Sequence, residues 1–294
     1  MLRRPGLFLP AFAVLILALG LIELRGVGAP PTPLHRAFGH GPTIVLVHGL
    51  GSRAEHWLPV ARKLAHDYRV VLVELPGHGS SDMPEPFSLE RATQSLVQAL
   101  EADSREPVIL VGHSVGGLVA VSAALAEPQR VRGLVLVETL LEPQMGGAER
   151  AAMLRALDHD YHGLLRSAFT AFGRDSVQGH ELYREAAAVD SGNLKRWIRL
   201  ALTADLAEPA TRLAMPVLAV LAQHSWPPSE EWSVTAAAMG YARIPDVRPV
   251  RLTDCGHFIM LDRPNELARL IARFAAHPHG EPIARNGRFA AARY

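Results

Sequence analysis

Six short runs rich in valine, leucine and isoleucine constrain the fold of this chain more than any other feature. They occupy residues 43–49, 69–77, 107–114, 131–138, 216–222 and 247–254. Continuous apolar runs are typical of strands that are covered on both faces, as in a parallel sheet. Segments with helical periodicity separate most of them, at residues 57–66, 88–102, 115–126, 229–239 and 264–276. This alternation predicts an α/β fold, a doubly wound and mostly parallel sheet with helices on both faces.

One long interval interrupts the alternation. Between Glu138 and Pro216 no strand pattern appears, and helical stretches occur instead at residues 148–158, 161–172, 180–189 and 193–203. We expect these helices to form a cap over the carboxyl edge of the sheet. The polar and aperiodic end of the chain is predicted to be disordered. The predicted organisation is a core of residues 31–139 and 213–277, a helical cap at 140–212 and a disordered tail at 278–294.

The N-terminal segment, residues 1–30, contains an uncharged apolar run from Leu7 to Ile22. The run is long for the core of a signal peptide and slightly short for a membrane span of ~20 residues. We predict an uncleaved transmembrane signal anchor, with a signal peptide cleaved near Ala29 and a buried helix as alternatives. Because Arg3 and Arg4 precede the run, the rest of the chain is expected on the non-cytoplasmic side, either membrane-anchored or exported.

Charge and composition exclude several classes of function. The net charge of +1 gives no indication of nucleic-acid binding. The 14 histidines show no spacing typical of metal ligands, so no metal site is predicted. Cys255 is the single cysteine and therefore has no partner for an internal disulfide.

The sequence Gly112-His113-Ser114-Val115-Gly116 matches G-x-S-x-G, between a predicted strand and a predicted helix. In this context the chain must reverse sharply, so the residues flanking the serine have to be small. The turn exposes the serine hydroxyl at the positive end of a helix, which favours developing negative charge. We predict that Ser114 is a nucleophile; the alternative is an ordinary polar residue in a tight turn.

From about Arg36 to Ala276 the chain resembles the α/β-hydrolase family. The resemblance rests on the serine motif together with "LVHGLGS" (46–52), "ELPGHGSSD" (74–82) and "CGHFIMLDRPNEL" (255–267), in this order and spacing. It implies a lidded serine hydrolase that needs no cofactor, with a catalytic serine, acid and histidine in that chain order.

The resemblance also implies roles for individual residues. His257, on a glycine-containing loop after the last predicted strand, is expected to be the general base. The main-chain amides of Leu50 and Val115 are expected to form the oxyanion hole. His48 and His78 lie in glycine-containing turns and are interpreted as structural residues.

The third catalytic residue departs from the commoner family pattern. An aspartate usually follows the strand at 216–222, but Ser225 stands at that position here. Glu138, at the end of the strand after the nucleophile helix, resembles the acid of the haloalkane dehalogenase branch of this fold. A glutamate at the end of a buried strand also needs a partner, since an unpaired buried charge is costly. We predict Glu138 as the acid, with Glu230, Glu231 or a Ser–His dyad as alternatives.

Trp57, Trp226 and Phe258 lie beside the motif loops. They are predicted to form part of the substrate pocket, and packing in the core is the alternative for each of them.

These observations predict an enzyme, a serine hydrolase that cleaves a carboxylic ester or related small acyl compound through an acyl-enzyme. The same residues also suit a thioester, an amide, a C–C bond beside a ketone or, with peroxide, perhydrolysis. A ligand sensor without catalysis is the remaining alternative, because a fold does not fix a function.

Overall fold

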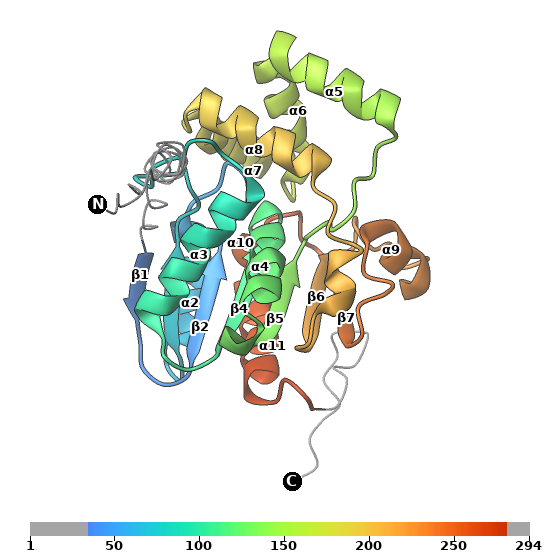
Figure 1. Ribbon diagram of the computed structural model, residues 1–294. Helices are drawn as coiled ribbons and strands as arrows, with labels where there is room; N and C mark the ends of the chain where they lie inside the picture. Colours follow the sequence, from blue (N-terminus) through green and yellow to red (C-terminus); the bar gives the residue numbers. More distant parts are fainter. Residues whose placement is uncertain (1–34, 281–294) are drawn as a thin grey trace, which may run out of the picture. The chain divides into compact units, whose positions relative to one another are not determined.

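The computed structural model of the protein describes residues 35–280. Its seven strands are β1 (His35–Phe38), β2 (Thr43–Val47), β3 (Arg69–Val73), β4 (Val108–His113), β5 (Val131–Val137), β6 (Val217–Ala222) and β7 (Val247–Leu252). They form one sheet in the order β1-β3-β2-β4-β5-β6-β7 (Figure 1). Only β1 is antiparallel to its neighbour, and the other six strands are parallel. The predicted α/β fold class is therefore confirmed.

Helices cover both faces of the sheet because side chains along each strand alternate between the faces. In β2, Ile44 and Leu46 pack into one buried cluster and Val45 and Val47 into the other. The first face is covered by η1 (Ala54–Trp57), α2 (Leu58–Leu64), α10 (Ile259–Asp262) and α11 (Pro264–Ala276). The second is covered by α3 (Leu89–Asp103), α4 (Val115–Ala126) and α9 (Trp232–Met239), with the short turns η2 (Pro128–Arg130) and η3 (Pro209–Arg212).

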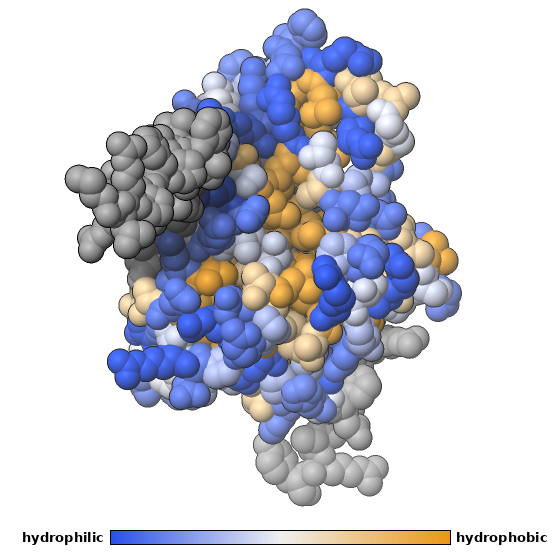
Figure 2. All heavy atoms as spheres, viewed as in Figure 1, coloured by the Kyte–Doolittle hydropathy of each residue, from blue (hydrophilic) through white to orange (hydrophobic). Residues whose placement is uncertain are grey.

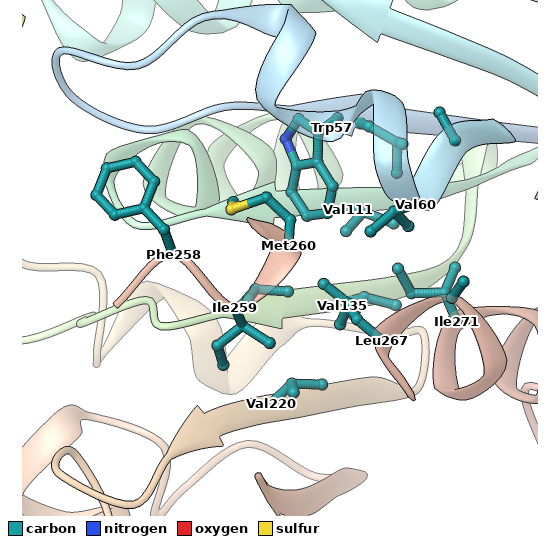
Figure 3. Close-up of a cluster of buried hydrophobic side chains, with 14 of the residues drawn as sticks. Trp57, Val60, Val111, Val135, Val220, Phe258, Ile259, Met260, Leu267 and Ile271 are labelled. Atoms are coloured by element: carbon teal, nitrogen blue, oxygen red, sulfur yellow. The ribbon is translucent and has the colours of Figure 1, made fainter. Parts of the chain in front are cut away.

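The first cluster shows how the strands and helices hold together. Figure 3 shows Trp57 and Val60 facing Val111 of β4, with Leu267 and Ile271 of α11 packed beside Val135 of β5. All six side chains are fully buried. Burying a side chain of this size stabilises the fold by roughly 1.5–3 kcal/mol. The sheet is therefore a rigid support for the loops at its carboxyl edge.

Four helices separate β5 from β6: α5 (Gly147–His159), α6 (Tyr161–Phe172), α7 (Ser176–Ala187) and α8 (Ser191–Thr203). Figure 1 shows them beyond the carboxyl ends of the central strands. An aspartate caps the start of three of them, because the side chains of Asp160, Asp175 and Asp190 each accept a hydrogen bond from a backbone amide of the first turn. The division into a core and a cap at 140–212 stays a prediction, which the position of these helices supports.

The membrane attachment predicted from sequence is corrected. None of the helices in residues 35–280 is long and apolar enough to cross a membrane. The run Leu7–Ile22, on which the prediction rested, lies outside the described residues and falls short of the ~20 residues that a helix needs to cross the bilayer. The transmembrane signal anchor, the membrane as a partner and the non-cytoplasmic location are therefore withdrawn. From residue 281 onward the predicted disordered tail also lies outside the described part of the chain.

Candidate active site

Ser114 lies in a strained turn between β4 and α4. Its φ angle is +52°, in a region that side chains other than glycine rarely adopt. Small neighbours make this turn feasible: a Cβ on Gly112 would lie 2.5 Å from the Cα of Gly117, and one on Gly116 would overlap the carbonyl oxygen of His48. The amide of Ser114 donates to the Val137 carbonyl at 3.0 Å, which ties the turn to β5. The hydroxyl is thereby fixed at the N-terminus of α4.

The loop after β2 passes directly over this turn. β2 and β4 are adjacent in the sheet, and a Cβ on Gly49 would lie 3.0 Å from the Cβ of Ser114. Within residues 35–280 the main-chain amides of Leu50 and Val115 have no hydrogen-bond acceptor. Two unpaired amides beside a serine hydroxyl suit an oxyanion, which needs donors fixed in advance.

His257 lies on the loop between β7 and α10. Its Nδ1 is 3.1 Å from Oε2 of Glu138, and its ring stacks on Phe172 at 4.5 Å between centroids. The backbone is fixed as well, because its amide donates to the Phe172 carbonyl at 2.9 Å and its carbonyl accepts from Nε2 of His113 at 2.9 Å. Burial lowers the pKa of His113 well below its usual value, so this ring is neutral. Hydrogen bonds to Phe172 and His113 therefore fix the backbone of His257, and its contacts with Glu138 and Phe172 fix the orientation of its ring.

The structure brings Glu138 and His257 together, and it brings the loop of Leu50 to the turn of Ser114 and Val115. No hydrogen bond joins Ser114 Oγ to His257 in the described part of the chain. In ligand-free enzymes this bond is often long and tightens only when the substrate binds. The serine, acid and histidine assignments therefore stay predictions that rest on this geometry.

Glu138 is the most heavily bonded side chain of the site. It closes β5 with a φ angle of +50°, and its side chain is 1% exposed. Oε1 accepts from the amide of Ala222 at 2.6 Å, and Oε2 accepts from Oγ of Ser225 at 2.8 Å and from His257. Nε2 of His224 lies 3.1 Å from the same Oε2.

Electrostatics keep this carboxylate ionised. Burial alone raises the pKa of Glu138, but the hydrogen bonds and charges of His224 and His257 outweigh it and lower the pKa to about 2. An ionised carboxylate at Nδ1 fixes the tautomer of His257 and leaves its Nε2 free to accept a proton. This is the arrangement that a general base requires.

The alternative acids do not reach His257. The Glu230 carboxylate accepts from Thr235, and Glu231 lies at the N-terminus of α9 without a hydrogen bond to His257 in the described part of the chain. Sequence reasoning missed His224 and Ser225 as partners of Glu138. Both residues follow β6, at the position where the family usually carries its catalytic acid. That position indicated that the loop after β6 lies close to His257.

The three predicted pocket residues lie in the core. Trp57 is fully buried, and Phe258 belongs to the same cluster (Figure 3). Trp226 belongs to the cluster on the other face of the sheet. The ring of Phe258 lies 5.8 Å from that of His257. Trp57 and Trp226 therefore fit the alternative prediction, packing in the core, whereas Phe258 stays a candidate for the pocket wall.

Comparisons with known proteins show the family and the fold. A model described as the alpha/beta hydrolase family matches residues 44–270. A pimeloyl-[acyl-carrier protein] methyl ester esterase of Nitrosospira multiformis is 27% identical over 261 residues, which is 81% of this chain and 96% of that protein. The enzyme of the same name from Pseudoalteromonas atlantica is 38% identical over 113 residues, 38% of this chain and only 42% of that protein.

Solved structures give the same fold. A hydrolase from Oleispira antarctica superposes with a TM-score of 0.72 at 18% identity, and the match covers 84% of this chain and 96% of the other. An esterase from Rhodococcus gives a TM-score of 0.67 at 23% identity, covering 85% of this chain and 96% of the other. At these identities the likeness extends to the fold alone.

Proposed function

The chain belongs to the alpha/beta hydrolase family, as its motifs indicated, and from this premise we propose that it is a serine hydrolase that cleaves carboxylic esters through an acyl-enzyme. The chain is an α/β-hydrolase enzyme with relatives named as esterases. The serine mechanism and the ester substrate are the parts that we propose. The observation that carries the proposal is the contact of buried, ionised Glu138 with Nδ1 of His257, beside the strained serine turn.

The proposed reaction uses each group in turn. Ser114 Oγ attacks the carbonyl carbon while His257 Nε2 takes its proton, and Glu138 stabilises the imidazolium that forms. The amides of Leu50 and Val115 donate to the oxyanion, assisted by the positive end of α4. His257 then protonates the leaving alcohol, and a water molecule that it activates releases the acid from Ser114.

An acyl group with an apolar chain suits the surface above the site. Figure 2 shows a strip of hydrophobic side chains down the centre of the visible face, from between α5 and α8 towards α4. Contiguous apolar surface of this kind is typical of sites that bind apolar ligands. The relatives named as methyl ester esterases support an ester with a small leaving alcohol.

The experiment that tests the proposal is labelling with a fluorophosphonate probe, together with hydrolysis of p-nitrophenyl esters. The Ser114→Ala variant is expected to lose labelling and to fall by at least ~10³ in turnover while remaining folded. Ser176→Ala, an exposed serine at the start of α7, is the matched control and should keep both. Full labelling of the Ser114→Ala variant would show that another residue is the nucleophile. A wild-type protein that neither labels nor turns over would favour the ligand sensor.

A further inference from the structure

We propose that Glu138, His224 and His257 form a binding site for a divalent transition metal ion, with Zn²⁺ as the best fit, and that occupation of this site switches the enzyme off. The inhibition rests on the proposed function, whereas the binding of the ion does not.

The three ligand atoms already lie close together. His224 Nε2 and His257 Nδ1 are each 3.1 Å from Glu138 Oε2, and all three atoms lie within 4.8 Å of one another. Ligands of a tetrahedral zinc ion, bound at 2.0–2.2 Å, are about 3.3 Å apart. Two of the three separations therefore match. Only the two histidine nitrogens have to approach each other, by a rotation of the more exposed ring, that of His224.

Exposure and support of the ligands favour binding from solvent. The side chain of His224 is 48% exposed, that of His257 is 13% exposed and that of Glu138 is 1% exposed. His224 can therefore meet the ion first and deliver it to the two fixed ligands. The amide of Ala222 holds the second carboxylate oxygen at 2.6 Å, which orients Glu138 as outer hydrogen bonds orient ligands in known metal sites. Two histidines and one carboxylate are also a set that zinc adopts in enzymes.

Coordination at Nδ1 removes the general base. The ion takes the place at Nδ1 that the proton shared with Glu138 held, and the single proton of the neutral ring moves from Nδ1 to Nε2, so the ring keeps its proton. A neutral imidazole metallated at Nδ1 carries its remaining proton on Nε2. That nitrogen then has no lone pair with which to accept the proton of Ser114, and the ion also occupies the oxygen of Glu138 that stabilised the imidazolium.

The inhibition is tested with ZnCl₂ and ester hydrolysis, each variant being compared with its own rate in the absence of metal. His224→Gln keeps an N–H donor for Glu138 but removes the nitrogen ligand. We expect it to need at least ~10-fold more Zn²⁺ for half-inhibition than the wild type, by analogy with the 10–100-fold losses of affinity at perturbed metal sites. A chelator should restore the wild-type rate. His66→Gln is the matched control, because His66 is an exposed histidine whose Nδ1 lies 2.7 Å from the carboxylate of Asp67, a residue that the proposed site does not use.

Binding is tested without activity by adding Co²⁺ to the Ser114→Ala variant and recording its visible absorption. A band typical of tetrahedral cobalt is expected, and the Ser114→Ala/His224→Gln double variant should lack it. If the band depends on His224 but the wild-type protein shows no esterase activity, the metal site stands and the proposed function fails. Equal Zn²⁺ sensitivity of wild type and His224→Gln, or a cobalt band that persists in the double variant, overturns the site.

Discussion

At the scale of the residue, Glu138 balances a large cost of burial against an unusual number of donors. A buried carboxylate without partners would be neutral or would destabilise the fold. Here the amide of Ala222, the hydroxyl of Ser225 and the rings of His224 and His257 surround its two oxygens. Burial raises the pKa of Glu138, but the hydrogen bonds and charges of His224 and His257 lower it to about 2, so the negative charge is present throughout the physiological range.

The role of this charge is tested by Glu138→Gln, which keeps the shape of the side chain. We expect kcat to fall by about 10³–10⁴, because the imidazole of His257 loses the group that fixes its tautomer and stabilises its cation. Steady-state kinetics and the thermal midpoint are the measurements. Glu231→Gln, which changes an exposed residue at the start of α9, is the control and should be near neutral. If Glu231→Gln lost most of its kcat while Glu138→Gln stayed active, the catalytic acid would be Glu231 and not Glu138.

The sequence was sufficient to single out Glu138 and insufficient to describe its surroundings. A glutamate that ends a buried strand needs a partner, and Ser225 at the usual acid position removed the commoner choice. That same serine donates to Glu138, and His224 lies beside it. Neither contact follows from sequence, because both depend on how the loop after β6 folds back towards β5.

At the scale of the element, two buried histidines join the loop after β2 to the turn after β3. Nε2 of His78 accepts from the amide of Gly51 at 3.1 Å, and Nδ1 donates to the Pro76 carbonyl at 3.2 Å. His48 accepts from the amide of Leu75 at 3.0 Å and contacts the ring of His78. The loop that carries Leu50 is therefore fixed by side chains that the sequence had indicated only as structural.

The bond from Gly51 requires a neutral His78, which makes stability depend on pH. Burial lowers the pKa of His78 from 6.5 to about 3 in the folded protein. Between pH 6.5 and about 3, His78 is protonated in the unfolded chain but neutral in the folded chain. The contribution of His78 is thus complete above pH 6.5 and is lost as the pH falls towards 3, at up to ~1.4 kcal/mol per pH unit.

His78→Gln keeps an acceptor for Gly51 but does not titrate. We expect the free energy of unfolding of this variant to depend less steeply on pH between 4.5 and 6.5, by up to ~1.4 kcal/mol per unit. Urea unfolding at several pH values measures the slope. Leu182→Ala, which destabilises the buried face of α7 without removing a titratable group, should keep the wild-type slope. Parallel slopes in all three proteins would exclude this role for His78.

At the scale of the whole molecule, the sheet and most helices were predictable and the small edge strand was not. The apolar runs predicted six strands because burial on both faces demands such composition. β1 has the sequence HRAF, which contains no such run, and it is a strand because it pairs with β3. The second run was predicted to extend from residue 69 to Gly77, but its strand, β3, ends at Val73, since Pro76 cannot continue a ladder of backbone hydrogen bonds.

The helices between β5 and β6 also hold the histidine loop, a connection that no sequence pattern indicated. The carboxylate of Asp262, at the end of α10, accepts from Arg174 at 3.1 Å, from Gln178 at 2.6 Å and from the amide of Gly256 at 2.8 Å. Its side chain is fully buried. The start of α7 and the residue before His257 are therefore bonded to one carboxylate.

Asp262→Asn tests whether this connection positions His257. The amide turns an N–H group towards donors that need an acceptor, so at least one of the three bonds is lost. We expect kcat and the rate of fluorophosphonate labelling to fall together by about 10-fold or more, since misplaced catalytic groups are costly even when the change is remote from the chemistry. Asp254→Asn is the matched control: its side chain is 76% exposed and pairs with Arg263 at the surface, where an ion pair contributes at most ~1 kcal/mol. Equal rates in both variants would show that the inserted helices bind the loop without orienting its histidine.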